Sequence, residues 1–213
     1  HYLHRRQRQM CIRDSPNVWW KLTCTAIKRV CKESNIDPKK IISIGISYQM
    51  HGLVIVDKNG ESLRDSIIWC DSRAVNIGSD AYEKLGEDKC MSHLLNSPGN
   101  FTASKLKWVK ENEPEVYEKI YKYMLPGDFI AYKLTGEINT TRNGLSEGII
   151  WDYKKNEIAN WLLDFYGINP NLTPDLVDNF TNQGATNSKS SEETGLNIGC
   201  LLYTSPSPRD SRV

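Results

Sequence analysis

Residues 41–60, IISIGISYQMHGLVIVDKNG, constrain the fold more than any other part of the chain. In IISIGIS, isoleucine alternates with serine and glycine, which is the period of a β-strand. LVIV then forms a second apolar segment, and the Asn-Gly pair after it predicts a tight hairpin turn. A third apolar run lies at residues 67–69. The pattern predicts strands that meet, at one end of a sheet, through Gln49, Met50 and His51.

Two interpretations of Gln49, Met50 and His51 follow from the residues alone. Methionine commonly fills gaps in a core, and a histidine can be a buried side chain whose hydrogen bonds are satisfied. Alternatively, the three residues form a step that faces a ligand, because α/β sheets bind ligands at the ends of their strands. Both interpretations stay open at this level.

Helical patterns alternate with these strands. Trp19, Ile27 and Val30 share one face of an amphipathic helix expected over residues 18–34. Further helices are expected up to about residue 85, before Pro114, after Pro126 and up to Gly167. This alternation predicts an α/β or α+β class. One mixed sheet is expected to contain residues 41–46, 53–56 and 66–69, with the first helix packed on it.

Composition excludes several classes of protein. The chain has 213 residues, 39% of them hydrophobic, and a net charge of +1, which is typical of one globular domain and gives no support for a nucleic-acid partner. The sequence contains no apolar run of 18 residues, so no membrane partner is expected. Six cysteines without a Cys-x-x-Cys motif favour free thiols in the cytoplasm and give no metal-ligand spacing.

The two ends differ from the rest. Residues 201–210 read as a translated sequencing-library adapter, and residues 9–14 read as the complementary strand of the same adapter. We therefore expect residues 1–15 and 200–213 to be non-native and to make few tertiary contacts. These ends hold six of the 27 basic and two of the 26 acidic residues, so residues 16–199 carry a net charge of −3.

Several motifs occur in a defined order between the two ends. In sequence they are PNVWW, ISYQMHGLVIVD, LRDSIIWCDSRA, SPGNFTASKLKWVKENEPEVYEKI, YMLPGDFIAYKLTGE and EGIIWD. Together they resemble the FGGY family of sugar kinases, most closely xylulokinases, over residues 16–199. The resemblance implies an α/β fold: the actin-like, ribonuclease-H-like N-terminal, sugar-binding domain of such a kinase, truncated at both ends.

The resemblance also implies an activity. The full-length protein is expected to use ATP and Mg²⁺ to phosphorylate D-xylulose to D-xylulose 5-phosphate, as a cytoplasmic enzyme that could form a homodimer. The family's Asp-x-Gly-Thr phosphate loop and its Gly-Asp-Asn or Gly-Asp-Gln motif do not occur in the sequence. The second motif carries the catalytic aspartate, expected beyond Gly199. We therefore assign no catalytic residue here, and expect the 213-residue chain to be inactive and to bind no cofactor.

The resemblance places the Gln49–Met50–His51 step against the ketose. Neutral imidazole offers one donor and one acceptor to neighbouring hydroxyl groups. Asp71, Asn100 and Phe101 are the other expected sugar-binding residues. For Asp71 a structural ion pair with Arg73 stays open, as does a core role for Phe101, while Trp69 and Arg73 match the family's Trp-x-Asp-x-Arg motif. Lys105 and Trp108 are expected to be scaffold residues.

Other functions stay open from the sequence. Within the same class, the substrate could be another ketose, a polyol or gluconate. A different class would be a non-catalytic sugar-binding module of the same fold, for which the complete gene would also lack the two missing motifs. A glycosidase that used Asp71 and Glu147 would need their carboxyl groups about 5–10 Å apart across an open cleft. We do not assign Glu147 as a base, because the family's base lies elsewhere.

Overall fold

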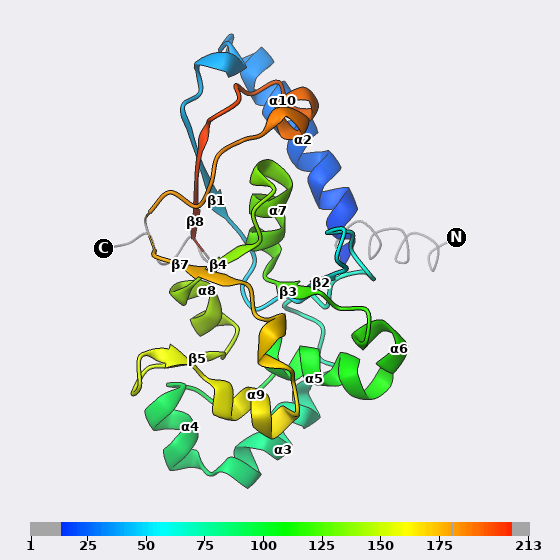
Figure 1. Cartoon of the computed structure of the whole chain (residues 1–213), viewed down its shortest axis with the longest axis vertical. Coiled ribbons are helices and arrows are strands. Elements are labelled where there is room, and N and C mark those ends of the chain that lie inside the picture. The colour runs from blue at the N-terminus through cyan, green and yellow to red at the C-terminus, as the bar shows by residue number, and fades with distance from the viewer. Residues whose placement is uncertain (1–13, 180, 206–213) are drawn as a thin grey trace.

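The computed structural model describes residues 14–179 and 181–205, and Figure 1 shows their arrangement. The helices are α2 (Pro16–Glu33), α3 (Val75–Leu85), α4 (Glu87–His93), α5 (Thr102–Asn112), α6 (Pro114–Tyr117), α7 (Pro126–Thr135), α8 (Arg142–Glu147), α9 (Asn160–Tyr166) and α10 (Ser188–Thr194), with 3₁₀ turns η1 (Pro38–Lys40) and η2 (Pro170–Leu172). The strands are β1 (Ser43–Ser47), β2 (Val54–Val56), β3 (Lys122–Met124), β4 (Asn139–Thr141), β5 (Trp151–Asp152), β6 (Glu157–Ile158), β7 (Asp175–Val177) and β8 (Leu201–Ser205).

The described strands form pairs rather than the single mixed sheet that we predicted. β1 pairs with β8 and β4 with β7 in parallel, whereas β2 pairs with β3 and β5 with β6 in antiparallel fashion. The expected strand at residues 66–69 is reduced to one bridge between Ile67 and Leu53. The next carbonyl, that of Ile68, accepts hydrogen bonds from Lys105 Nζ at 3.0 Å and from the Asp71 N–H at 3.1 Å, and neither donor belongs to a strand.

The hairpin and the position of the first helix agree with the sequence predictions, but the predicted apolar face of the helix is partly wrong: Val30 is 59% exposed, and α2 buries Trp20 and Cys31 instead. α2 has Pro16 in its first turn, where a missing N–H is tolerated, and it packs against α7 and α10. The hairpin turn after β2 has Gly60 at φ 76°, and the Asp57 carboxylate accepts hydrogen bonds from the backbone N–H groups of Asn59 and Glu61.

The buried hydrophobic residues that the structure describes form three clusters. One joins Trp20 of α2, Leu134 of α7 and Leu202 of β8 with Leu196, which follows α10. A second joins β2, β3 and α7 through Val54, Met124 and Phe129. The largest cluster receives side chains from α3, α5 and α9, which lie in the lower part of Figure 1. On α9 it buries Leu162, Leu163 and Tyr166, while Phe165 is 41% exposed. This helix ends at Tyr166, before the predicted Gly167, whose φ of 63° is the left-handed conformation typical of a C-cap.

The prediction of few tertiary contacts is wrong for residues 200–205. Cys200 and Leu202 are buried, and β8 pairs with the whole length of β1. Burial of Leu202 counts against a foreign origin for this end, but a short apolar run with an aromatic and a threonine is compatible with an open strand edge whatever its origin. At the other end, Asp14 accepts a hydrogen bond from Ser66 N–H at 2.7 Å. Residues 1–13 and 206–213 lie outside the described residues, and the boundaries at 15 and 200 stay a prediction.

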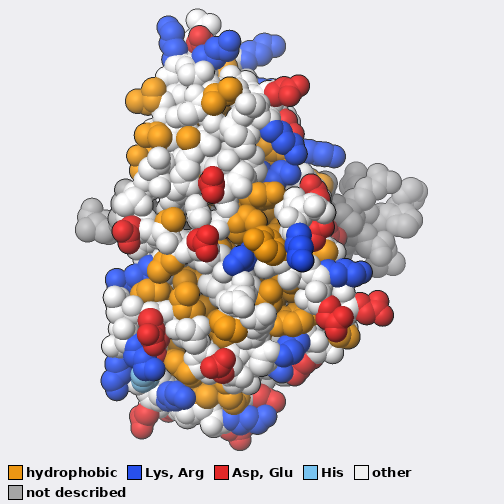
Figure 2. Space-filling view, viewed as in Figure 1, with side chains coloured by type: hydrophobic (Ala, Val, Ile, Leu, Met, Phe, Trp, Pro, Cys, Tyr) orange, Lys and Arg blue, Asp and Glu red, His pale blue; other side chains and the backbone are white. Residues whose placement is uncertain are grey.

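The surface carries both signs of charge. On the face in Figure 2, hydrophobic side chains gather near the middle, and Lys, Arg, Asp and Glu side chains are interspersed around them. Among the described residues, no helix combines the length and the apolarity that a bilayer span requires.

Candidate functional site

The Gln-Met-His step is a strained turn between β1 and β2. Met50 and His51 form the turn, and His51 has φ 38°, in the left-handed region that non-glycine residues rarely occupy. Gly52 follows with its backbone against Pro126 of α7, where an added Cβ would lie 2.6 Å from the proline Cγ. The close packing of Gly52 and the turn together fix the place of the His51 side chain. Strain of this kind is found disproportionately at functional sites.

The His51 imidazole lies against Phe101. The two ring centroids are 4.7 Å apart at an interplanar angle of 63°, an edge-to-face contact. Burial, and secondarily the charge of Lys105, lower the pKa of His51 to about 4, so the ring is neutral at physiological pH. Its Nδ1 atom is buried and has no hydrogen-bond partner within the protein.

Asn100 lies beside the same cluster on the loop before α5. Its side-chain N–H group donates to the Asp71 carbonyl at 2.6 Å, while its buried Oδ1 has no partner within the protein. The backbone of α3 presses on this loop, since a Cβ added at Gly78 would lie 1.9 Å from the Gly99 carbonyl oxygen. The loop is therefore held rigidly, with one unsatisfied acceptor.

Asp71 forms an ion pair with Arg73. The guanidinium donates from Nε to Oδ1 at 2.9 Å and from Nη2 to Oδ2 at 2.7 Å. Burial disfavours the charged form of Asp71, but the hydrogen bonds and charge of Arg73 outweigh it and hold the carboxyl pKa below its usual value. Arg73 also stacks over the Trp108 ring at 4.6 Å. The ion pair that the sequence left open is thus present.

The remaining predicted residues lie at the edge of the cluster. Gln49 accepts a hydrogen bond from the Trp69 N–H group through Oε1 at 3.4 Å. The Trp69 side chain is 56% exposed and that of Met50 is 37% exposed. Two apolar side chains beside orphaned polar atoms suit the C–H face of a sugar, which stacks on exposed apolar surface.

Lys105 is the residue at the site that the sequence reasoning undervalued. It is fully buried, and its Nζ donates to the carbonyls of His51 and Ile68, both at 3.0 Å. A signal for this burial was present. Thr102, Lys105, Leu106 and Val109 follow the i, i+3, i+4, i+7 spacing of the buried face of α5.

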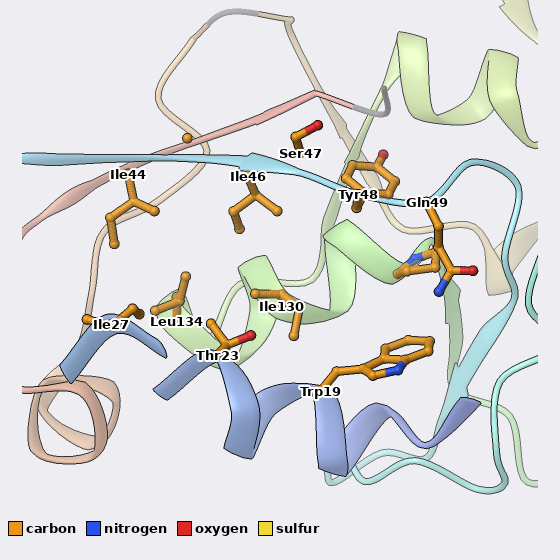
Figure 3. A pocket seen from close by; sticks show the side chains of 12 residues that line it. Trp19, Thr23, Ile27, Ile44, Ile46, Ser47, Tyr48, Gln49, Ile130 and Leu134 are labelled. Atoms are coloured by element: carbon orange, nitrogen blue, oxygen red, sulfur yellow. The ribbon is translucent and has the colours of Figure 1, made fainter. Parts of the chain in front are cut away.

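A separate groove lies on the other side of Gln49, between β1, α2 and α7. It measures about 440 Å³. In Figure 3, Ile44 and Ile46 point from β1 toward Thr23 and Ile27 of α2. Its lining is mostly apolar, with Trp19, Ile130 and Leu134 completing its walls. It offers little to a ligand rich in hydroxyl groups.

The cofactors implied by the resemblance do not fit the described residues alone. Among those residues, no group of three His, Cys, Asp or Glu side chains could hold a metal ion. The site described above instead offers neutral donors, acceptors and apolar surface.

Comparison with known proteins places this domain in a family. Residues 2–205 match the N-terminal domain of the FGGY family of carbohydrate kinases. The chain belongs to this family, and the family fold agrees with the α/β prediction made from the sequence.

Particular relatives narrow the comparison. The chain is 32% identical to the xylulose kinase of Bacillus subtilis (strain 168) over 188 residues, covering 86% of this chain and 37% of the relative. A crystal structure of a xyloylose kinase from Brucella ovis superposes with a TM-score of 0.79 at 26% identity, covering 91% of this chain and 39% of that one. A gluconate kinase from Lactobacillus acidophilus shares the fold, with a TM-score of 0.79 at 22% identity over 89% of this chain and 39% of that one. The chain thus spans about two fifths of the length of these proteins.

Proposed function

We propose that the full-length protein is an ATP-dependent kinase for an open-chain ketopentose, D-xylulose, and forms D-xylulose 5-phosphate. In this proposal the domain supplies the sugar-side wall of the site. The relatives named xylulose kinase support the substrate class. The observation that carries the proposal is the pair of orphaned buried atoms, His51 Nδ1 and Asn100 Oδ1, in a site where the His51 ring is neutral.

The chemistry of the site favours an uncharged substrate. Arg73 is occupied by Asp71 through two short hydrogen bonds, so neither of these charges is free for a ligand. A gluconate carboxylate would need a free cation to compensate its desolvation. A ketose requires only hydroxyl partners, which His51 and Asn100 supply.

The proposed roles follow the geometry of each side chain. His51 accepts from or donates to one sugar hydroxyl, and Asn100 Oδ1 accepts from another. Phe101, Met50 and Trp69 contact the apolar C–H face. Gln49 and Asp71 hold the surrounding backbone through hydrogen bonds with Trp69 and Asn100. The base that deprotonates the attacking hydroxyl is proposed to lie outside residues 16–199.

Kinase assays of the full-length protein test the proposal. ADP release would be measured with D-xylulose, D-ribulose, gluconate and glycerol, each from limiting to saturating concentration. We expect the highest kcat/KM with D-xylulose. A higher value with gluconate or glycerol would refute the assignment of substrate, and sugar binding without ADP release would instead indicate a non-catalytic sugar-binding module.

The cytoplasmic location and the homodimer are also proposals. The cytoplasmic location is supported by the cysteine pattern: six cysteines without a Cys-x-x-Cys motif favour free thiols, which are typical of that compartment. Light scattering of the full-length protein would test the second.

A further inference from the structure

Lys105, on the buried face of α5, places a charged group in the interior of the protein. Its side chain is fully buried, and a buried ammonium group is costly unless hydrogen bonds compensate it. The Nζ atom donates to the carbonyls of His51 and Ile68, both at 3.0 Å. Burial lowers the pKa of Lys105 to about 8, so most of the side chains are still protonated at neutral pH.

These carbonyls belong to the two segments that form the candidate site. His51 lies in the turn after β1, and Ile68 immediately follows the bridge between Ile67 and Leu53. The ammonium group of Lys105 therefore links the His51 turn to the start of the Trp69–Arg73 segment by hydrogen bonds. The carbonyl that accepts from Lys105 belongs to the residue with the left-handed φ of 38°, and the imidazole of the same residue contacts Phe101.

We propose that Lys105 is a positioning residue for the sugar: it holds the His51 backbone so that a neutral imidazole faces a substrate hydroxyl. Lys105 does not touch the sugar in this proposal, since its described hydrogen bonds go to backbone. The inference rests on the proposed function, because it needs a sugar at His51.

A second lysine provides a matched control. Lys122 of β3 donates in the same way to two backbone carbonyls, those of Asn171 at 2.9 Å and Thr173 at 2.7 Å. It connects β3 to the η2 region rather than to the candidate site. Loss of Lys122 should therefore affect stability without affecting the sugar.

The experiment compares Lys105→Met, Lys105→Gln and Lys122→Met in the full-length protein. We expect Lys105→Met to raise KM for D-xylulose at least about tenfold, the effect of roughly 1.4 kcal/mol, and to leave KM for ATP within about twofold. Lys105→Gln keeps an N–H donor but loses the charge and reaches less far, so an intermediate increase is expected. Lys122→Met should lower the melting temperature and keep both KM values within about twofold.

Titration of the His51 imidazole tests whether the Lys105 charge acts on the ring, while KM for D-xylulose tests the positioning role. The charge of Lys105 contributes to the lowered pKa of His51, after burial. Lys105 in turn lies near the charges of Asp71 and Arg73, and both remain in the variant. In Lys105→Met, NMR of the ring should therefore show protonation at higher pH, and the acidic limb of kcat/KM should move the same way. Lys122→Met should move neither.

The possible results separate the two proposals. Wild-type sugar kinetics in Lys105→Met or Lys105→Gln, beside an active wild type, would overturn the positioning role alone. If Lys105→Met fails to fold, the KM of Lys105→Gln decides in the same way. A wild type that phosphorylates no sugar would overturn the proposed function and this inference with it.

Discussion

Replacing His51 by alanine in the full-length protein should weaken sugar binding more than it weakens the fold. The ring presents one unpartnered buried nitrogen, and its contact with Phe101 is an edge-to-face contact at 4.7 Å. A hydrogen bond contributes about 0.5–1.5 kcal/mol net, and an unpaired buried partner costs about 1–3 kcal/mol. At roughly 1.4 kcal/mol for each tenfold change, kcat/KM for the ketose should fall about three- to a hundred-fold.

Ligand-induced stabilisation measures the same loss without turnover. A ketose at about 100 times its Kd stabilises the wild type by about 2.7 kcal/mol. If alanine weakens Kd tenfold, the same concentration stabilises the variant by only about 1.4 kcal/mol. Thermal unfolding with and without D-xylulose therefore reports the site directly, and KM for ATP should move much less.

Backbone strain at His51 calls for a second variant. With φ at 38°, alanine carries a cost of about 1–2 kcal/mol that asparagine largely avoids, because short polar side chains tolerate the left-handed region. His51→Asn should therefore melt close to the wild type and still lose affinity for the ketose.

His93→Ala is the matched control. His93 is a half-buried histidine whose Nδ1 is 2.8 Å from the fully buried carboxylate of Asp152, outside the candidate site. Its loss should lower the melting temperature and leave sugar kinetics unchanged, the reverse of the pattern for His51. If His51→Asn keeps wild-type kinetics, or if saturating sugar restores the turnover of a destabilised His51→Ala, then His51 is a core histidine and the reasoning is refuted.

Three further predictions concern Asp128, self-association and the gene. Burial raises the pKa of Asp128 to about 7, so the folded state retains a proton that the unfolded chain loses above about pH 4. The free energy of unfolding should fall by up to roughly 4 kcal/mol between about pH 4 and pH 7, and denaturant titrations of Asp128→Asn should lack this slope. Among the described residues β1 pairs only with β8 and the apolar groove lies open, so the isolated 213-residue chain should self-associate; a monodisperse monomer with one cooperative melt would contradict this. Sequencing of the gene across both ends should show that it encodes other residues in place of residues 1–15 and 200–213. A continuous reading frame that encodes these residues would refute the adapter interpretation.

The sequence predicted the elements better than it predicted their pairing. Alternating isoleucines, the Asn-Gly turn and the helical pattern of α2 are local, and each of these elements formed within about two residues of the predicted range. The buried face of α2 was predicted less well, because Val30 is exposed and Trp20 is buried. The partner of β1 is residues 201–205, more than 150 residues away along the chain, and local period carries no information about such pairing. β8 was also missed for a specific reason, since its residues were set aside as foreign before their strand propensity was considered.

For the site, the sequence located the segments but not the contacts. The alternation of apolar residues predicted that Gln49, Met50 and His51 lie at the end of a strand. The family resemblance indicated Asp71, Asn100 and Phe101. The contact between His51 and Phe101 and the bidentate pairing of Asp71 with Arg73 needed coordinates in space. The sugar-binding roles themselves stay predictions, which the variants above are designed to test.

Two places in this domain could be considered for a sugar: the groove beside β1 and the turn at His51. The groove of about 440 Å³ beside β1 is lined mostly by apolar side chains, and its polar lining residues are few: Thr23, Ser47, Tyr48 and Gln49. Most hydroxyl groups of a sugar that entered it would therefore lose water without gaining a partner. At the His51 turn, by contrast, the protein has polar atoms that lack hydrogen-bond partners. There the protein itself keeps two buried polar atoms unsatisfied, holds a non-glycine residue at positive φ and buries a lysine. Each feature costs stability, and a sugar hydroxyl would offset the cost of the unsatisfied atoms directly. These costs make the turn, and not the groove beside β1, the place where we expect a sugar to bind.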